Sequence, residues 1–212
     1  MENDYRQILV EGVKQLGLSL SANSIATLLG YHQLLIKWNK AYNLTAVRDP
    51  MEMISRHLLD SLTISQYLQG QRFIDVGAGA GLPGIILAII FPDRQFDLLD
   101  SNGKKTRFLV QVKAELKLAN VNVHNCRVEQ FHPEELYDGV ISRAFATLAD
   151  MAQGSEQLLS AGGCFYAMKG LYPEQELKQL SDLQKGYKVE ASHSLSVPGE
   201  TGERHLIVVS HH

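Results

Sequence analysis

The sequence has 212 residues, of which 45% are hydrophobic, so it can bury the core of one globular domain of average to large size. Its formal net charge of −3 excludes nucleic-acid binding driven by the charge of the whole molecule, and any such binding needs a local basic patch. The two cysteines form no CxxC pair, which indicates free thiols rather than a zinc site. Neither an apolar run of about 18 residues nor a signal-peptide pattern occurs, so we expect a cytoplasmic protein without a membrane segment.

Residues 1–69 are predicted to be helical, because their apolar side chains recur at helical spacing. Ser19, Ser21 and Asn23 are candidate N-caps within this segment. The pattern then changes to short β-rich runs alternating with helical stretches, which is typical of a parallel sheet covered by helices. We therefore expect an N-terminal helical segment, 1–69, that packs on an α/β domain formed by 70–212.

The second part contains seven predicted strands and four predicted helices. The strands are expected at 72–76, 95–100, 121–125, 138–142, 163–169, 187–194 and 205–209, and the helices at 82–91, 104–119, 147–159 and 173–183. No helical stretch separates the last two strands, so they are expected to pair as an antiparallel hairpin at one edge of the sheet. The first five strands are expected to be parallel.

The segment 75–84 carries a glycine-dense turn between an apolar strand and an apolar helix. This arrangement is typical of a nucleotide-binding βαβ unit, in which Gly77, Gly79 and Gly81 let the backbone approach the ligand closely. We expect the helix to begin near 82–83 and to present unpaired N–H groups there.

Asp75 lies two residues before the first of these glycines. A carboxylate at this position repels a pyrophosphate and attracts an ammonium group, so it favours S-adenosylmethionine over NAD as the ligand. The alternative is that Asp75 only braces the loop through backbone N–H groups.

Two further positions complete the expected cofactor site. Asp100 ends the second strand and is expected to bind the ribose hydroxyls, or alternatively to cap the helix that follows. Val128 and Glu129 follow the third strand, where the valine can contact the adenine and the carboxylate can bind its polar edge. Taken alone, Glu129 is also compatible with a solvated loop acid.

Six motifs occur along the chain in a specific order. They are Trp38-Asn39-Lys40-x-Tyr42-Asn43-Leu44-Thr45, Arg56-His57-x-x-Asp60-Ser61, Asp75-x-Gly77-x-Gly79-x-Gly81-Leu82-Pro83-Gly84, Ser142-Arg143-Ala144-Phe145, Met168-Lys169-Gly170 and Gly202-Glu203-Arg204-His205. Together they closely resemble the RsmG family, also called glucose-inhibited division protein B, over essentially the whole chain.

This resemblance implies a class I S-adenosylmethionine-dependent methyltransferase. The implied fold is a Rossmann-like, mainly parallel seven-stranded sheet with a terminal antiparallel hairpin and an N-terminal helical extension. The implied substrate is N7 of a guanine in 16S rRNA, in a loop near the decoding site, and the implied product of the cofactor is S-adenosylhomocysteine, with no metal ion. Motif matching also implies cofactor contacts from Gly77, Leu82, Val128, Glu129 and Arg143.

The chemistry fits the residues present. Guanine N7 carries a lone pair and no proton, so its methylation needs no general base and no covalent enzyme intermediate, and alignment supplies most of the catalysis. Arg143, after the fourth strand, is the candidate positioning residue for the methionine carboxylate, the guanine O6 or a phosphate, and Phe145 is expected to stack on the flipped base. The alternative for Arg143 is a structural ion pair with an acid such as Asp100.

Candidate RNA contacts lie in the helical segment and near two strand ends. They are Lys40, Asn43, Arg56, His57, Lys169 and Arg204. For the neighbouring aromatic residues Trp38 and Tyr42, core packing is the alternative. The expected partner is 16S rRNA within the 30S subunit or an assembly intermediate, and the expected state is a monomer.

Two other functions stay open from the sequence alone. Gly79-x-Gly81-x-x-Gly84 also fits the dinucleotide fingerprint of an NAD(P)-dependent oxidoreductase, although the chain has no Tyr-x-x-x-Lys pair for short-chain dehydrogenase chemistry. A non-catalytic RNA-binding assembly module with the same fold is the other alternative.

Overall fold

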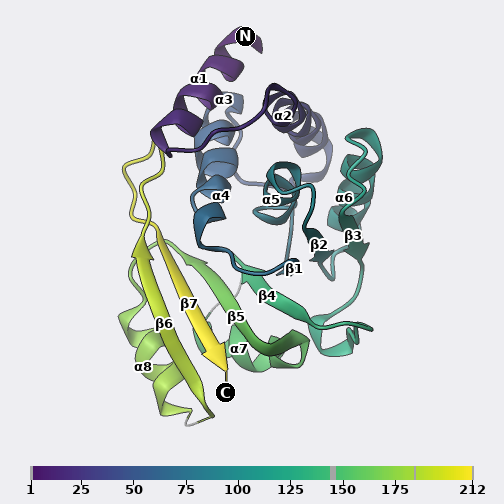
Figure 1. The fold of residues 1–212 in the computed structure, drawn as a ribbon. Coiled ribbons are helices and arrows are strands. Elements are labelled where there is room, and N and C mark those ends of the chain that lie inside the picture. Colours follow the sequence, from purple (N-terminus) through teal and green to yellow (C-terminus); the bar gives the residue numbers. More distant parts are fainter. Residues whose placement is uncertain (1, 144–146, 184, 212) are drawn as a thin grey trace.

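The structure is a computed structural model that describes residues 2–143, 147–183 and 185–211. Its centre is a seven-stranded sheet with the strand order β3-β2-β1-β4-β5-β7-β6 (Figure 1). The strands are β1 (Arg72–Val76), β2 (Gln95–Leu99), β3 (Val121–His124), β4 (Tyr137–Ser142), β5 (Leu159–Lys169), β6 (Tyr187–Ser194) and β7 (His205–His211). All seven coincide with predicted strands, although β5 begins earlier than expected.

The strand directions confirm five parallel strands and a terminal hairpin. β1 pairs in parallel with β2 and β4, and aligns Ile74 with Asp97 and Val140. β7 runs antiparallel to both β5 and β6, so β7 lies inside the sheet and β6 forms its edge. The burial pattern agrees with this strand order, because β7 is buried along its centre whereas β6 is largely exposed.

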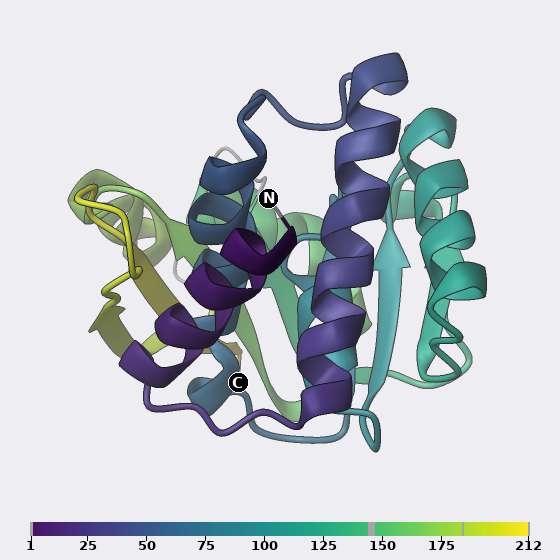
Figure 2. The ribbon, with the colours of Figure 1, turned by 90° about the horizontal axis from the view of Figure 1, so that it is seen from above.

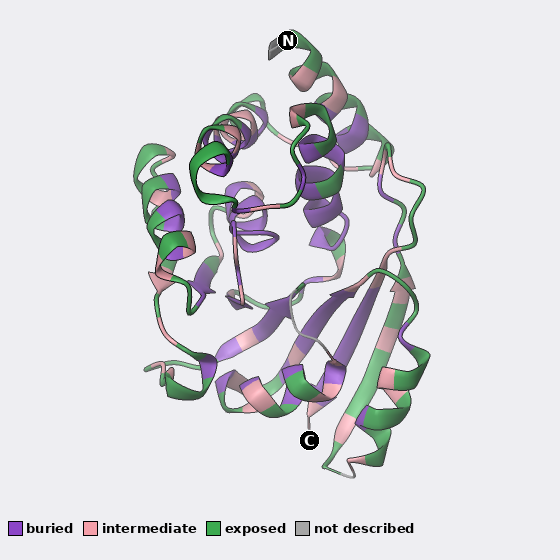
Figure 3. Ribbon diagram, turned by 180° about the vertical axis from the view of Figure 1, so that it is seen from behind, coloured by how far each residue is buried: buried purple, intermediate pink, exposed green. Residues whose placement is uncertain are grey.

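Helices cover both faces of the sheet (Figures 1 and 3). α7 (Leu148–Ser155) and α8 (Glu174–Asp182) pack on one face, in a core that contains Ile74 and Val76 of β1. α5 (Gly84–Ile90) and α6 (Gly103–Glu115) pack on the other face, in a core that contains Phe73. The alternation along β1 therefore sends successive side chains into two different cores.

The N-terminal segment is helical, as predicted. Its elements are α1 (Glu2–Gln15), α2 (Ala22–Tyr42), α3 (Pro50–Met53), a π-helical stretch (Ile54–Leu59), α4 (Asp60–Leu62) and a 3₁₀ turn (Ser65–Tyr67). Ser21 is the N-cap of α2, since its side chain accepts a hydrogen bond of 3.0 Å from the Ser24 N–H. α2 contacts both α5 and α6 (Figure 2).

The N-terminal helices share a hydrophobic core with the sheet. α2 buries Leu28, Tyr31 and Leu35, which are three or four residues apart and so lie on one face of the helix. They belong to the same core as Phe96 of β2 and Phe108 of α6. Separating these helices from the sheet would therefore expose apolar surface. No helix in the described part of the chain is long and apolar enough to cross a membrane.

Candidate cofactor and substrate site

The carboxyl ends of β1 and β2 and the loop after β3 enclose a pocket of about 300 Å³. It is lined by Val76, Gly77, Leu99, Asp100, Ser101, Lys105, Cys126, Arg127, Val128 and Glu129. Four of the residues predicted to bind the cofactor, namely Gly77, Asp100, Val128 and Glu129, are thus brought together. This edge is where open α/β sheets bind their ligands.

A second pocket of about 230 Å³ adjoins the first, and Gly77 and Lys105 line both. Its other lining residues are Leu44, Thr45, Ala78, Gly79, Ala80, Leu82 and Arg143. Leu44 and Thr45 come from the connection between α2 and α3, so the N-terminal segment forms one wall of this pocket.

The glycine loop has the conformation that its sequence predicts. Gly77, Gly79 and Gly81 have φ angles of 73°, 60° and 86°, in the left-handed region that favours glycine. A Cβ on Gly81 would lie 2.4 Å from Cγ1 of Ile85, so packing requires this glycine. A Cβ on Gly79 would meet no atom closer than 3.8 Å, so the space beside Gly79 is left open within the pocket.

The N–H groups of this loop are largely bonded within the protein, contrary to expectation. Those of Gly77 and Ala78 donate to the carbonyl oxygen of Leu99 at 2.8 and 3.1 Å. The helix begins at Gly84 rather than at 82–83, and its first N–H donates to Oδ2 of Asp75 at 2.8 Å. A helix start closed by a carboxylate is a poor site for a pyrophosphate, which needs free N–H groups there.

Asp75 lies beneath the glycine loop with 1% of its surface exposed. Its Oδ1 has no hydrogen-bond partner among the described residues. Burial raises the pKa of Asp75 to about 7, although the Gly84 N–H and the Arg143 charge lower it. Asp75 does not appear among the described residues that line the two pockets, and its observed contact is the loop brace. An interaction with a cofactor ammonium group therefore stays a prediction.

Asp100 connects the glycine loop to the start of α6. Its Oδ2 accepts a hydrogen bond from Gly79 N–H at 2.9 Å, and its Oδ1 accepts one from Asn102 N–H at 2.8 Å. Lys105 Nζ lies 3.8 Å from Oδ2. The N-cap of α6 is Asn102, so the capping role considered for Asp100 is wrong. Asp100 faces the first pocket with its carboxylate already held by two backbone groups.

Val128 and Glu129 lie in a 3₁₀ turn (Val128–Gln130) at the rim of the first pocket. Val128 is 8% exposed and packs on the core beneath, whereas Glu129 is exposed. The turn thus offers one apolar and one charged side chain to the same pocket.

Arg143 lines the second pocket, and its ion-pair partner is Asp60 rather than Asp100. Arg143 Nη1 lies 3.1 Å from Oδ2 of Asp60, and Arg204 Nε lies 3.1 Å from Oδ1 of the same carboxylate. Burial raises the pKa of Asp60, whereas both guanidinium groups lower it. Three of the sequence motifs, carrying Asp60, Arg143 and Arg204, therefore meet at one point.

His57 lies in the interior, where 4% of its surface is exposed. Its Nε2 is 2.8 Å from Oγ1 of Thr45, and its Nδ1 is 2.9 Å from the carbonyl oxygen of Arg56. Burial, together with the charge of Arg143, lowers the pKa of His57 to about 4, so the ring is neutral at neutral pH. These contacts make His57 a brace for Thr45, which lines the second pocket.

Asn43 braces the same connection between α2 and α3. It ends α2 in the left-handed conformation, with a φ of 51°, and its Oδ1 accepts a hydrogen bond of 2.7 Å from Nη2 of Arg48. The buried Asn39 accepts a hydrogen bond of 2.9 Å from Thr45 N–H. Side chains of the first motif therefore shape the wall of the second pocket.

Of the two aromatic residues near Lys40, Trp38 packs against the protein, whereas Tyr42 is 44% exposed. Trp38 stacks on Tyr42 with ring centroids 5.1 Å apart, and it tilts against Phe108 of α6 at 5.6 Å. The packing alternative for Trp38 is thus confirmed. Lys40 itself is exposed.

Lys169 and Phe145 complete the predicted substrate residues. Lys169 ends β5, and its Nζ lies 2.8 Å from Oε2 of Glu176 in α8. Phe145 lies outside the described residues.

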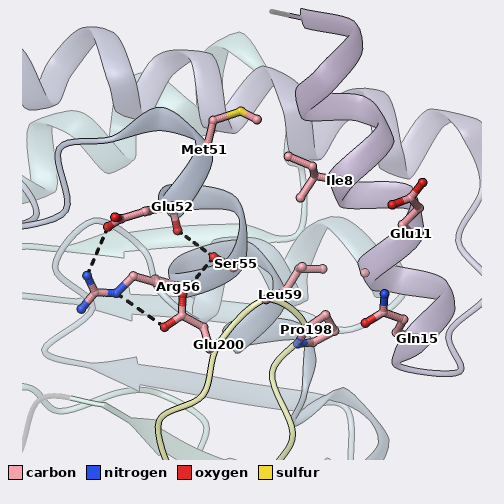
Figure 4. Close-up of a pocket in the computed structure, with 12 residues that line it drawn as sticks. Ile8, Glu11, Gln15, Met51, Glu52, Ser55, Arg56, Leu59, Pro198 and Glu200 are labelled. Carbon is pink, nitrogen blue, oxygen red and sulfur yellow. Dashed lines mark hydrogen bonds and ion pairs between the residues drawn. The ribbon is translucent and has the colours of Figure 1, made fainter.

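Arg56 lines a third pocket, of about 500 Å³, between α1, the π-helical stretch and the loop before β7, and its guanidinium extends toward Glu52 and Glu200 (Figure 4). It pairs there with Glu52 at 3.4 Å and with Glu200 at 4.0 Å. Ser55 Oγ also donates a hydrogen bond of 3.0 Å to Glu200. Arg56 is not among the described residues that line either of the two adjoining pockets.

The sequence and fold match known proteins. The family described as rRNA small subunit methyltransferase G matches residues 24–207. The chain belongs to this family. It is 54% identical over 203 residues to the Ribosomal RNA small subunit methyltransferase G of Ectopseudomonas mendocina (strain ymp), covering 95% of this chain and 94% of the relative. It is 52% identical over 211 residues to that of Stutzerimonas stutzeri (strain A1501), covering 99% of this chain and 97% of the relative.

Solved structures show the fold of this rRNA small subunit methyltransferase G family member. The glycopeptide N-methyltransferase MtfA complexed with S-adenosyl-L-methionine has a TM-score of 0.61 at 11% identity, covering 74% of this chain and 87% of that one. An S-adenosylmethionine-dependent methyltransferase from Thiobacillus denitrificans, in complex with S-adenosyl-L-homocysteine, has a TM-score of 0.54 at 13% identity, covering 73% and 91%. The class I methyltransferase fold is thereby confirmed, and the antiparallel β7 distinguishes it from the all-parallel dinucleotide-binding order.

Three site residues received no role from the sequence. For Asp60 and Thr45, membership of the quoted motifs was the only sequence feature that pointed to a role. Their partners, Arg143 and His57, lie in other segments of the chain, so the contacts appear only in the fold. Lys105 lines both pockets and lies near Asp100, but a lysine in the first turn of a helix has no distinguishing pattern.

Proposed function

We propose that this chain transfers a methyl group from S-adenosylmethionine to N7 of a guanine in 16S rRNA, with the 30S subunit or an assembly intermediate as substrate. Membership of the rRNA small subunit methyltransferase G family supports activity on rRNA. The observation that carries the cofactor assignment is the pair of adjoining pockets beside the glycine loop. We further propose that the protein acts as a cytoplasmic monomer without a metal ion, and that S-adenosylhomocysteine is released.

The first pocket suits the adenosine end of the cofactor. Val128 offers apolar contact to a base, and Glu129 offers a polar contact at the rim. Asp100 offers carboxylate oxygens to the ribose hydroxyls. Its backbone contacts to Gly79 and Asn102 use one lone pair on each oxygen, which leaves a second lone pair on each for a ligand.

The second pocket suits the methionine end. Gly77, Gly79 and Leu82 line it, and the open space beside Gly79 lets a ligand approach the backbone closely. Arg143 and Lys105 supply positive charge for a carboxylate. We therefore assign Arg143 to the cofactor carboxylate, among the three ligands considered for it from the sequence.

The chemistry requires alignment more than proton transfer. S-adenosylmethionine supplies an electrophilic methyl group when bound, and guanine N7 attacks through a lone pair that carries no proton. The residues of the chain then bind the two partners, orient them and exclude water. His57 is not required as a base, because guanine N7 has no proton to lose, and both its ring nitrogens already have partners within the protein.

We assign RNA binding to the N-terminal segment, 1–69, and to the loop that carries Arg204. Lys40 is exposed on α2, and the side chain of Arg204 is 26% exposed beside Asp60. Both cations can pair with phosphates. Because the net charge of the protein is −3, attraction to phosphates is confined to a local basic patch. We therefore propose that the protein recognises the shape of folded RNA rather than a short single strand. The other residues predicted to bind the substrate are weaker candidates than Lys40 and Arg204. They are Asn43, Arg56, His57, Phe145 and Lys169.

Methyl transfer to 30S subunits that lack the modification tests the proposal. The protein is incubated with methyl-labelled S-adenosylmethionine and these subunits, with naked 16S rRNA in parallel, and nucleosides of the product are analysed. Labelled 7-methylguanosine from the subunits is the expected result. Label only in naked rRNA would replace the proposed substrate. Cofactor binding without label in either reaction would overturn the activity and favour a non-catalytic RNA-binding module.

A further inference from the structure

One buried carboxylate joins three distant parts of the chain. Asp60 begins α4, directly after the π-helical stretch, and 2% of its surface is exposed. Its Oδ2 accepts a hydrogen bond of 3.1 Å from Nη1 of Arg143, which follows β4, and its Oδ1 accepts one of 3.1 Å from Nε of Arg204, which precedes β7. Each oxygen thus holds a different arginine.

The two arginines reach the surface although their shared partner does not. The side chain of Asp60 is 3% exposed, whereas those of Arg143 and Arg204 are 32% and 26% exposed. Each guanidinium therefore has one side fixed by a buried carboxylate and another side accessible to an anion. Arg143 lines the second pocket, and Arg204 lies on the loop that leads into β7.

The loop that carries Arg204 has a second attachment to the same helical segment. Ser55 Oγ, in the π-helical stretch, donates a hydrogen bond of 3.0 Å to Glu200 (Figure 4). Within the connection between β6 and β7, Leu195 N–H donates to the carbonyl oxygen of Arg204 at 2.8 Å. The loop therefore has an attachment to the helical segment that does not involve Asp60. The guanidinium of Arg204 is held at two points, because its Nη1 donates to the carbonyl oxygen of Glu203 at 2.7 Å and its Nε donates to Asp60.

We propose that Asp60 is a positioning residue that directs Arg143 to the cofactor carboxylate and Arg204 to an RNA phosphate at the same time. This role rests on the proposed function. Two guanidinium groups held by one carboxylate repel each other once that charge is removed. Both side chains would then have to be ordered during ligand binding, which costs conformational entropy and weakens both interactions.

A double-mutant cycle tests the proposal. Affinity for S-adenosylmethionine is measured by calorimetry, and kcat and KM for 30S subunits are measured at a temperature where every variant is folded. We expect Arg143→Gln to weaken cofactor binding and Arg204→Gln to raise the KM for 30S subunits. Asp60→Asn should do both, each by about fivefold or more.

The double variants separate positioning from a structural role. In Asp60→Asn/Arg143→Gln, cofactor affinity should lie within about twofold of that of Arg143→Gln alone, because residues that act through one contact are not additive. In Asp60→Asn/Arg204→Gln, the KM for 30S subunits should likewise match that of Arg204→Gln. Fully additive losses, or a lower melting temperature with unchanged affinity and KM in Asp60→Asn, would overturn the proposal.

Asp97→Asn is the matched control. Asp97 is also a buried carboxylate, 6% exposed, which accepts hydrogen bonds from Asn122, His124 and Tyr137 and lines neither pocket. It should lose stability without a change in cofactor affinity or KM. If Asp60→Asn does not fold, Asp60→Glu keeps the charge and displaces it by one methylene, and unchanged binding in that variant overturns the proposal.

The order of measurements distinguishes the two proposals. Transfer by the unmodified protein is measured first. If no methyl is transferred to any RNA, the proposed function fails. If transfer occurs and Asp60→Asn leaves its kinetic constants unchanged, only the positioning role of Asp60 fails.

Discussion

The hydroxyl of Tyr31 donates a hydrogen bond of 2.7 Å to the carbonyl oxygen of Ala80. Tyr31 lies within α2 and is fully buried, whereas Ala80 belongs to the glycine loop and lines the second pocket. The bond joins an N-terminal helix to the candidate cofactor site. The N-terminal helices therefore help to fix the glycine loop, which we propose to contact the cofactor.

Tyr31→Phe should reduce both stability and cofactor affinity. The change keeps the ring but leaves the Ala80 carbonyl without this donor, at a cost of about 1–3 kcal/mol in the free energy of unfolding. Chemical denaturation and calorimetric titration with S-adenosylmethionine measure the two effects. Tyr137→Phe is the control, since Tyr137 donates to Asp97, which lines neither pocket, and should affect stability alone. Unchanged cofactor affinity in Tyr31→Phe would argue against control of the loop by α2.

Gly79→Ala and Gly81→Ala should fail in different ways. At Gly81 a Cβ would lie 2.4 Å from Ile85 and 2.8 Å from Leu109, so the variant should be strongly destabilised. At Gly79 the Cβ would meet no atom closer than 3.8 Å, so we expect a folded protein that loses about 1–2 kcal/mol through its positive φ. Its new methyl group should nevertheless obstruct the cofactor. The melting temperature of each variant is measured with and without S-adenosylmethionine. If the cofactor raises the melting temperature of Gly79→Ala as much as that of the unmodified protein, this expectation is wrong.

Asp100→Ala should weaken cofactor binding by at least about 1 kcal/mol, the scale of one lost hydrogen bond to a charged group. The variant also loses the contacts to Gly79 and Asn102, so Asp100→Asn, which keeps an acceptor oxygen, serves as the comparison. Calorimetry gives both dissociation constants. A dissociation constant equal to that of the unmodified protein in Asp100→Ala would remove Asp100 from the cofactor site.

Asp75 and His57 should give the stability opposite pH dependences. Burial raises the pKa of Asp75 from 3.8 to about 7, so the stability from its protonated form is complete below its ordinary pKa and is lost as the pH rises toward 7. Burial lowers the pKa of His57 from 6.5 to about 4, so its contribution is present above pH 6.5 and is lost as the pH falls toward 4. Between these limits the two contributions partly cancel.

Single variants should separate the two contributions. Compared with the unmodified protein, Asp75→Asn should become relatively more stable as the pH rises from 4 to 7, because the cost of ionising the buried acid is gone. His57→Gln should become relatively more stable as the pH falls over the same range. Urea denaturation at a series of pH values measures both differences. Difference curves with the same sign in the two variants would be incompatible with these pKa shifts.

The sequence was sufficient for the features that depend on local pattern. The strands, the Ser21 cap and the positive φ angles of the glycine loop follow from alternation, capping chemistry and the absence of a Cβ. Gly77, Asp100, Val128 and Glu129 met in one pocket because parallel strands end at a common edge. The sequence also indicates that β7 is buried, because four consecutive residues of β7 are apolar whereas apolar and polar residues alternate in β6.

Features that depend on long-range partners were not predictable. Arg143 pairs with Asp60 and not with Asp100, because α4 and the β7 loop approach the end of β4 only in the folded chain. The pattern predicted free N–H groups at the start of α5. Instead, the Gly84 N–H donates to Asp75, and the N–H groups of Gly77 and Ala78 donate to the carbonyl oxygen of Leu99. Each case turns on which of several chemically suitable partners the tertiary fold brings within 3 Å or so, a length typical of hydrogen bonds.

The π-helical stretch Ile54–Leu59 immediately precedes Asp60. Its turns are wider than those of an α-helix, and such insertions are frequent at functional sites. Because one residue rotates a helix by about 100°, deleting a residue here would preserve a helix yet carry the Asp60 carboxylate around to another side, away from both arginines. The π-helical stretch thus determines the direction in which the Asp60 carboxylate points. Without it, the neighbouring helices could keep their positions while this carboxylate would face another side of the helix.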